Sequence, residues 1–153
     1  MRYLELKIPP PVVALVCVAA MWAVAKVTPA FGVAPEVRWA FVGMFVIAGL
    51  FLDLRGLLAF LRARTSINPM TPQRASSLVT TGVYRYTRNP MYVGLACLVV
   101  AVAIFLDAPV GWLGVGIFVL YITRFQIQPE EAVLLENFGD SYRTYCDQVR
   151  RWL

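Results

Sequence analysis

Four long apolar blocks constrain this chain more than any other feature of its sequence. They run over residues 12–28, 39–61, 90–106 and 110–126. Each block is near or above the minimum of about 17 residues that a transmembrane helix needs. Charged residues make up only 15% of the chain, whereas soluble domains contain about a quarter. The sequence therefore predicts an all-α integral membrane protein, with about four transmembrane helices in a single domain spanning 1–153.

The basic residues predict how these helices are oriented. Five arginines lie within residues 62–88, and the N-terminal entry contains Arg and Lys, whereas the turns at 29–38 and 107–111 contain only Arg38. Cytoplasmic loops are enriched in Lys and Arg, so we expect a multi-pass protein with both termini and the 62–88 segment in the cytoplasm. The net charge of +5 then reflects topology, and no nucleic-acid partner is expected.

Amphipathic cytoplasmic helices are expected after the fourth apolar block. Residues 128–131, Gln-Pro-Glu-Glu, predict a helix start, because proline suits the first helical position and acids suit the first turn. Gly139 predicts the end of that helix. Residues 140–149 predict one more helix with an apolar face, and Arg-Arg-Trp at 150–152 suits an anchor at the membrane interface.

The segment from Gly82 to Gly94 combines more chemical features than any other part of the chain. Asn89 and Pro90 predict a helix start, because the Asn oxygen can accept a backbone N–H and proline has none to lose. The N-terminus of a helix carries partial positive charge and unpaired N–H groups, which suit an anionic or polar ligand. The alternative interpretation is the entry of a membrane helix, flanked by the positive charge of Arg88.

Residue types exclude several classes of site. The chain has no histidine, and its three cysteines are far apart, so we expect no metal, no haem and no Ser-His or Cys-His catalytic pair. Asp53 lies inside the second apolar block. A charged residue within the membrane is costly and suggests a function, although pairing with a neighbouring helix is the alternative.

Two motifs stand on either side of the predicted helical hairpin. The first is Gly82-x-Tyr84-x-x-x-Arg88-Asn89-Pro90-x-Tyr92-x-Gly94, and the second is Glu130-Glu131-x-x-Leu134 followed by Phe138-Gly139-x-x-Tyr142-x-x-Tyr145. Together they resemble the motifs of the isoprenylcysteine carboxyl methyltransferases and the related phospholipid N-methyltransferases. The resemblance covers about residues 62–153 and implies an integral membrane methyltransferase that binds S-adenosylmethionine at its cytoplasmic face. Residues 1–61 add two N-terminal transmembrane helices.

The resemblance also implies roles for individual residues. It assigns cofactor contacts to Ser77, Leu78, Val79, Tyr84, Asn89, Pro90, Met91, Tyr92 and Glu130. Arg88 and Glu131 become the candidate catalytic residues, the first to hold an acidic group and the second to accept a proton. Gln126, Arg124 and Asp53 are the candidate substrate residues. The family has an arginine facing the substrate carboxylate where this chain has Gln126, and a histidine where it has Asn89, which argues against a prenylcysteine substrate.

The expected reaction is an in-line methyl transfer from S-adenosylmethionine to a lipophilic acceptor, whose nucleophile is a carboxylate, a thiol or an amine. Membrane lipids and a lipophilic substrate are the expected partners, and the oligomeric state stays open. Two other functions compete with this one. The first is an NADPH-dependent membrane reductase of the sterol-reductase type, and the second is a membrane adaptor without enzymatic activity.

Overall fold

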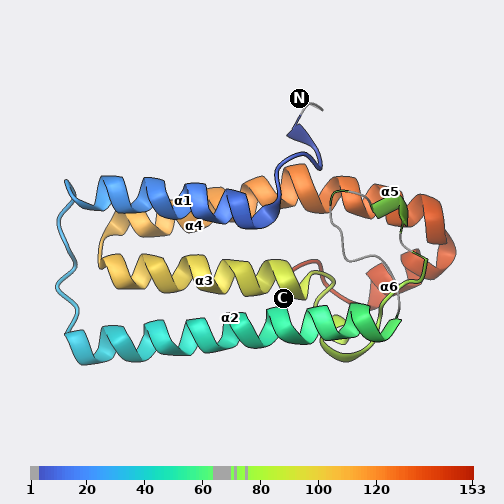
Figure 1. The fold of residues 1–153 in the computed structure, drawn as a ribbon, viewed down its shortest axis with the longest axis horizontal. Coiled ribbons are helices and arrows are strands. Elements are labelled where there is room, and N and C mark those ends of the chain that lie inside the picture. The colour runs from blue at the N-terminus through green and yellow to red at the C-terminus, as the bar shows by residue number, and fades with distance from the viewer. Residues whose placement is uncertain (1–3, 64–69, 71, 75) are drawn as a thin grey trace.

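The protein is described by a computed structural model for residues 4–63, 70, 72–74 and 76–153, and these residues form helices and no strand (Figure 1). The helices are α1 (Pro10–Ala25), α2 (Pro35–Ala63), α3 (Pro90–Leu106), α4 (Pro109–Ile122), α5 (Gln128–Phe138) and α6 (Asp140–Gln148). Short 3₁₀ helices cover Pro72–Arg74 and Gly82–Arg85. The predicted all-α class is confirmed for this part of the chain.

Helix length separates the predicted membrane spans into two groups. Within the described residues, Pro35–Ala63 and the continuous helix Pro109–Phe138 are long and apolar enough to cross a membrane. Pro10–Ala25 and Pro90–Leu106 are also apolar but shorter. The structure therefore supports a membrane protein with two long apolar helices, and the expected four-span topology stays a prediction.

Helix α3 lies between α2 on one side and α1 with α4 on the other (Figure 1). Buried side chains from α1, α3 and α4 form the main core, which includes Val13, Met21, Val99, Ala103, Phe118 and Ile122. Glycines bring α2 close to α3: a Cβ built at Gly49 would lie 2.8 Å from the Gly94 carbonyl oxygen, and one at Gly56 would lie 2.7 Å from Met91 Cγ. The α2–α3 contact thus depends on residues without side chains.

One end of the bundle is closed by Asp107, which ends α3 in the left-handed conformation at φ 52°. Its Oδ2 accepts hydrogen bonds from the backbone N–H groups of Gly32 (3.1 Å) and Val33 (3.2 Å). Arg38 at the start of α2 completes the arrangement with an ion pair of 3.6 Å. A single carboxylate therefore ties the α1–α2 connection to the tight turn between α3 and α4.

The predicted helix start at residues 128–131 agrees with the first residue of α5, Gln128, but no break in the helix precedes it. Helices α4 and α5 are continuous through a π-helical turn at Thr123–Ile127, so Pro129 lies inside one long helix. A proline there has no N–H for the carbonyl four residues earlier, which belongs to Phe125. That carbonyl instead accepts the backbone N–H of Leu6 at 3.0 Å. The N-terminal segment thus satisfies the group that the proline leaves unpaired, and the helix continues.

Other boundaries are closer to the prediction. Helix α3 begins at Pro90 and ends at Leu106 as expected, and α5 ends before Gly139, whose φ is 54°. Helix α1 begins two residues before the predicted 12–28 block and ends earlier, whereas α2 extends beyond the predicted 39–61 block at both ends. Prolines at the first turns of α1 and α2 account for both early starts, because proline suits the first turn of a helix.

Candidate functional site

The elements that carry both motifs lie at the end of the bundle where α3 begins and where α5 and α6 lie (Figure 1), and polar side chains of the two motifs contact one another there. Three elements meet there: the 3₁₀ helix Gly82–Arg85, the first turn of α3 and the π turn with the first turn of α5. The predicted proximity of the two motifs is therefore observed. Their meeting creates two adjacent polar clusters, one around each glutamate of the pair.

Glu130 is the centre of the first cluster. Its Oε1 accepts a hydrogen bond of 2.6 Å from the Tyr92 hydroxyl and one of 2.7 Å from Gln126 Nε2. Tyr92 lies in the first turn of α3, and the π turn supplies Gln126 one helical turn before Glu130. No residue in the described part of the chain donates a hydrogen bond to Oε2. The carboxylate is thus oriented through one oxygen and leaves the other available for a ligand.

Tyr84 stands beside this carboxylate. Its ring is buried and meets the edge of Phe60 at a centroid distance of 5.5 Å, and its carbonyl accepts the Tyr145 hydroxyl at 2.7 Å. Burial, together with Tyr145 and the negative charge of Glu130, raises the pKa of the Tyr84 hydroxyl well above its ordinary value. That hydroxyl therefore stays protonated, and it donates to none of the described residues. It is a second polar group at the site that can serve a ligand.

Glu131 is the centre of the second cluster, and both of its oxygens are paired. Arg151 donates from Nε to Oε1 at 3.0 Å and from Nη2 to Oε2 at 2.7 Å. Arg88 adds an ion pair of 3.2 Å and also contacts Cys146 Sγ. The hydrogen bonds to Glu131 raise the pKa of Arg151 above its ordinary value. Two guanidinium groups thus engage both oxygens of Glu131 within the protein.

The C-terminal residues 150–152 return to this site instead of extending away from it. The Arg88 N–H donates to the Arg150 carbonyl at 2.9 Å, and Asn89 Nδ2 donates to the Arg151 carbonyl at 2.9 Å. Trp152 Nε1 donates to Thr123 Oγ1 at 3.1 Å. Arg151 and Trp152 therefore bind the protein itself, which the prediction did not include, and their role as an interfacial anchor stays a prediction.

The helix start at Asn89 also differs from the prediction in its chemistry. The Asn89 side chain makes no capping hydrogen bond to the first turn of α3. Its amide is used for the Arg151 carbonyl, and its backbone N–H donates to Thr87 Oγ1 at 3.1 Å. Asn89 thus links the beginning of α3 to the C-terminus. The predicted N-cap role of its side chain is wrong.

The remaining predicted cofactor residues are mostly packed against neighbours. Ser77 Oγ donates to the Ala63 carbonyl at the end of α2 (3.3 Å), and Leu78 packs against the cluster of Tyr142, Tyr145 and Val149. Val79 and Pro90 are buried. Met91 faces Gly56 of α2, whereas Tyr92 faces Glu130. These side chains shape the walls of the site, where Tyr84 lies close enough for the negative charge of Glu130 to act on its hydroxyl.

The three predicted substrate residues lie in different places. Gln126 is buried at 2% exposure and belongs to the Glu130 cluster. Arg124 pairs with Glu5 of the N-terminal segment at 3.0 Å. Asp53 lies against Gly94, one turn further along α3 than Pro90, and its buried Oδ1 has no hydrogen-bond partner among the residues described. Gln126 and Asp53 therefore remain candidates, whereas the contact with Glu5 occupies the Arg124 guanidinium.

Sequence reasoning missed Arg151 as a residue of the site. Its charge was attributed to the membrane interface because an Arg-Arg-Trp sequence after an amphipathic helix is typical of an anchor. The pairing of Arg88, Glu131 and Arg151 joins three segments that are far apart in the chain. The available signal was the second glutamate itself, since a carboxylate that becomes partly buried is stabilised by a cation nearby.

Replacing Arg151 should therefore destabilise this end of the bundle. We expect Arg151→Ala to lower the free energy of unfolding by about 1–2 kcal/mol, because Glu131 loses a bidentate partner and retains one ion pair. Arg151→Lys should recover only part of this loss, since an ammonium group cannot form the two parallel bonds. Thermal unfolding in detergent measures both effects. Arg150→Ala is the matched control, because Arg150 is exposed, and an equal loss in that variant would contradict the prediction.

Comparisons with known proteins agree with the two motifs. Residues 37–141 match the sequence profile of the family described as "Phospholipid methyltransferase". An "Uncharacterized protein" from Haemophilus influenzae is 48% identical over 63 residues, which cover 41% of this chain and 100% of that protein. Protein-S-isoprenylcysteine O-methyltransferase from Dictyostelium discoideum is 35% identical over 72 residues, which cover 47% of this chain and 30% of that protein. The protein of the same description from Xenopus laevis is 29% identical over 121 residues, with coverages of 74% and 40%.

The chain spans less than half the length of these two isoprenylcysteine methyltransferases. The matched residues 37–141 nevertheless include most of the chain, with Tyr84, Tyr92 and Glu130 of the candidate site. A match of this extent shows the family, and the long apolar helices agree with a membrane protein. The chain belongs to the phospholipid methyltransferase family, and it is also similar to isoprenylcysteine methyltransferases.

Proposed function

We propose that this protein transfers a methyl group from S-adenosylmethionine to a lipophilic acceptor at one face of the membrane. The observation that carries the proposal is the carboxylate of Glu130. Tyr92 and Gln126 orient it through Oε1, and its Oε2 has no donor among the described residues. The site also lies at the end of apolar helices, where a ligand from the cytosol and one from the lipid can meet.

The residues present suit the chemistry of this cofactor. S-adenosylmethionine carries an ammonium group and ribose hydroxyls, which are the groups that a carboxylate binds best. Glu130 Oε2 would accept from one of them, and the protonated Tyr84 hydroxyl would donate to an oxygen or a nitrogen nearby. When bound, the cofactor supplies an electrophilic methyl group. The protein's own contribution is then to orient the two reactants, which can account for a large share of a rate enhancement.

Arg88, Glu131 and Arg151 hold the walls of the site in this proposal. They tie the beginning of α3, the first turn of α5 and the C-terminus together. Because Glu131 is paired with two cations, we assign it a positioning role in place of proton acceptance. Tyr92 and Gln126 are positioning residues for Glu130, and Asn89 positions the C-terminal segment.

The pairing of the site arginines bears on the acceptor. Arg88 and Arg151 are engaged by Glu131, and Arg124 is engaged by Glu5. Among the described residues of the site, the atoms without a hydrogen-bond partner are instead Glu130 Oε2, Asp53 Oδ1, the Tyr84 hydroxyl and the Nε of Arg88. Carboxylates attract an amine or a hydroxyl and repel another carboxylate. This arrangement favours a neutral or cationic acceptor such as an amine or a thiol, with Asp53 on the lipid side of the site.

Binding of S-adenosylhomocysteine tests the proposal against its rivals. Isothermal titration of the full chain in detergent should show binding of this product, whereas NADPH should give no heat. Tight binding of NADPH alone would support a reductase, and no binding of either would support an adaptor; both results would overturn the proposal. Transfer of a labelled methyl group from S-adenosylmethionine to lipid amines, compared with prenylated thiols and their carboxylates, then identifies the acceptor class.

The position of the site also predicts the membrane topology. We propose that all four apolar helices cross the membrane, with both termini and the candidate site in the cytoplasm. The support is the arginine content of the 62–88 segment and the short polar turn at Asp107. Single cysteines at exposed positions near each end of the bundle, labelled from one side of sealed vesicles, check this orientation.

A further inference from the structure

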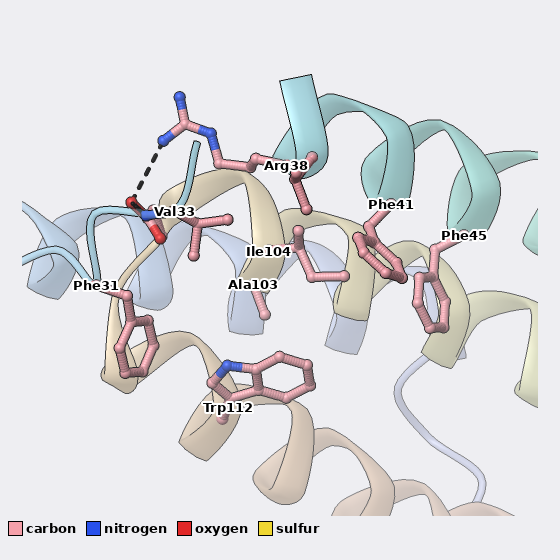
Figure 2. A pocket seen from close by; sticks show the side chains of 10 residues that line it. Phe31, Val33, Arg38, Phe41, Phe45, Ala103, Ile104 and Trp112 are labelled. Carbon is pink, nitrogen blue, oxygen red and sulfur yellow. Dashed lines mark hydrogen bonds and ion pairs between the residues drawn. The ribbon is translucent and has the colours of Figure 1, made fainter. Parts of the chain in front are cut away.

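A cavity of about 380 Å³ lies at the end of the bundle opposite the candidate site (Figure 2). The first turns of α2, the last turn of α3, the first turn of α4 and the α1–α2 connection surround it. Its walls are mainly apolar and aromatic, and they consist of Phe31, Val33, Val37, Phe41, Phe45, Ala103, Ile104 and Trp112. The volume is within the range of cavities that bind small organic ligands.

Two charged residues, Arg38 and Asp107, lie at the edge of this cavity, and they differ in how fully their hydrogen-bonding groups are paired. Asp107 is 6% exposed and already accepts two backbone N–H groups in addition to its ion pair with Arg38. Arg38 has a single ion pair of 3.6 Å, and its buried Nε has no hydrogen-bond partner in the described part of the chain. Figure 2 shows the guanidinium at the edge and the Phe41 and Phe45 rings further along α2. The edge therefore has donor capacity for an anion, whereas its carboxylate is satisfied.

The surroundings of the cavity are those of a surface in contact with lipid. Large apolar side chains beside it are exposed, including Trp39 at 55% and Leu113 at 68%. Helix α2 packs on α3 and, near its C-terminal end, on the 3₁₀ helix Gly82–Arg85, and many of its large side chains near the cavity are exposed. An apolar cavity that opens on such a surface is reached from the hydrocarbon region of a bilayer, and it suits a hydrocarbon chain better than a water-soluble ligand.

We infer that this cavity binds one membrane phospholipid, with an acyl chain among the aromatic walls and the phosphate on Arg38. The position of the charge supports this occupant. Arg38 lies in the first turn of α2, and Phe45 lies seven residues further along the helix, about 10 Å deeper at 1.5 Å per residue. A cation at the interface with an apolar cavity beneath it matches the order of a phospholipid's headgroup and tail.

This lipid site is separate from the methyl-transfer site. On α2 the residue that contacts the first turn of α3 is Gly56, eighteen positions after Arg38, or about 27 Å along the helix. A lipid bound at Arg38 therefore occupies the other membrane leaflet and is not the methyl acceptor. Its binding stabilises the connection between α1 and α2, and it does not depend on the proposed activity.

Native mass spectrometry of the full chain in detergent tests the inference. The probes are phosphatidylglycerol and a diacylglycerol with the same acyl chains, which differ in the phosphate-containing headgroup. Phosphatidylglycerol should bind as a single copy, and the diacylglycerol should bind at least about tenfold more weakly, because charge-assisted hydrogen bonds are lost. Arg38→Gln should weaken phosphatidylglycerol binding by a similar factor. Val37→Trp should abolish binding by filling the cavity.

Two controls keep the result interpretable. Ile47→Trp adds the same side chain on the same helix at a position that is 71% exposed, and its lipid binding should equal that of the wild type. Binding of S-adenosylhomocysteine by Arg38→Gln and Val37→Trp should be unchanged, which separates this inference from the proposed function. The inference is overturned if the wild type binds no phosphatidylglycerol, if diacylglycerol binds equally well, or if both cavity variants bind like the wild type.

Discussion

Glu130→Gln should weaken S-adenosylhomocysteine binding by about 10–100-fold and reduce methyl transfer at least as much. Glutamine keeps the size of the side chain, and its oxygen can still accept from Tyr92 and Gln126. What it loses is the negative charge, and hydrogen bonds to charged groups contribute about 1.5–3 kcal/mol compared with about 0.5–1.5 kcal/mol for neutral ones. An ion pair between the Glu130 carboxylate and the ammonium group of the ligand would add to this difference. Isothermal titration measures the affinity, and a labelled-methyl assay measures the transfer.

A second ligand shows which part of the cofactor Glu130 binds. 5′-Methylthioadenosine contains the adenosine and lacks the amino-acid part of S-adenosylhomocysteine. If Glu130 binds the ammonium group, Glu130→Gln leaves methylthioadenosine binding unchanged; if it binds the ribose, both ligands lose affinity. Glu136→Gln, an exposed glutamate on the same helix, is the matched control. Equal S-adenosylhomocysteine binding by the wild type and Glu130→Gln would show that the Glu130 charge does not bind the cofactor.

Gly94→Val should prevent the stable packing of α2 on α3. A Cβ at this position would overlap Asp53 Oδ1 and approach the Gly49 carbonyl oxygen to 2.9 Å. The Asp53 side chain can move, but the carbonyl belongs to the backbone of α2, so the two helices must separate. Overpacking of this kind costs about 1–3 kcal/mol in ordinary cores and more where the backbone has to shift. We expect a loss of monodisperse protein in detergent, or a marked fall in its unfolding temperature.

Gly43→Val is the matched control for this prediction. A Cβ built at Gly43, on α2, meets no atom within 4 Å, and the substitution introduces the same side chain into an apolar helix. The Gly43 variant should therefore retain the unfolding temperature of the wild type. The milder Gly94→Ala should be partly rescued by Asp53→Ala, which removes the carboxylate and leaves the backbone contact. A Gly94→Val protein as stable as Gly43→Val would show that α2 and α3 are not packed closely here.

Local sequence signals predicted the elements of the site better than its contacts. Pro90 indicated the first residue of α3 and Gly139 the end of α5, because a missing N–H and a positive φ are properties of single residues. Pro129 gave the same signal as Pro90, and α5 does begin at Gln128, but the chain before Pro129 is already helical, whereas the residue before Pro90 is not. The difference lies in Leu6, whose N–H pairs with the Phe125 carbonyl and lets the helix continue. No local pattern around Pro129 indicates a partner at the other end of the chain.

The sequence by itself determined the helical class, the apolar character and the motifs that carry the family relationship, because these depend on composition and on spacing within one segment. Only the tertiary structure decided how the charges are used. Glu130 and Glu131 are neighbours in the chain, yet one faces Tyr92 and keeps an oxygen without a described donor, whereas the other is held by Arg88 and Arg151. Successive residues of a helix point in directions about 100° apart, so their partners come from different elements. The partners of a charged side chain are set by which elements the fold brings beside it.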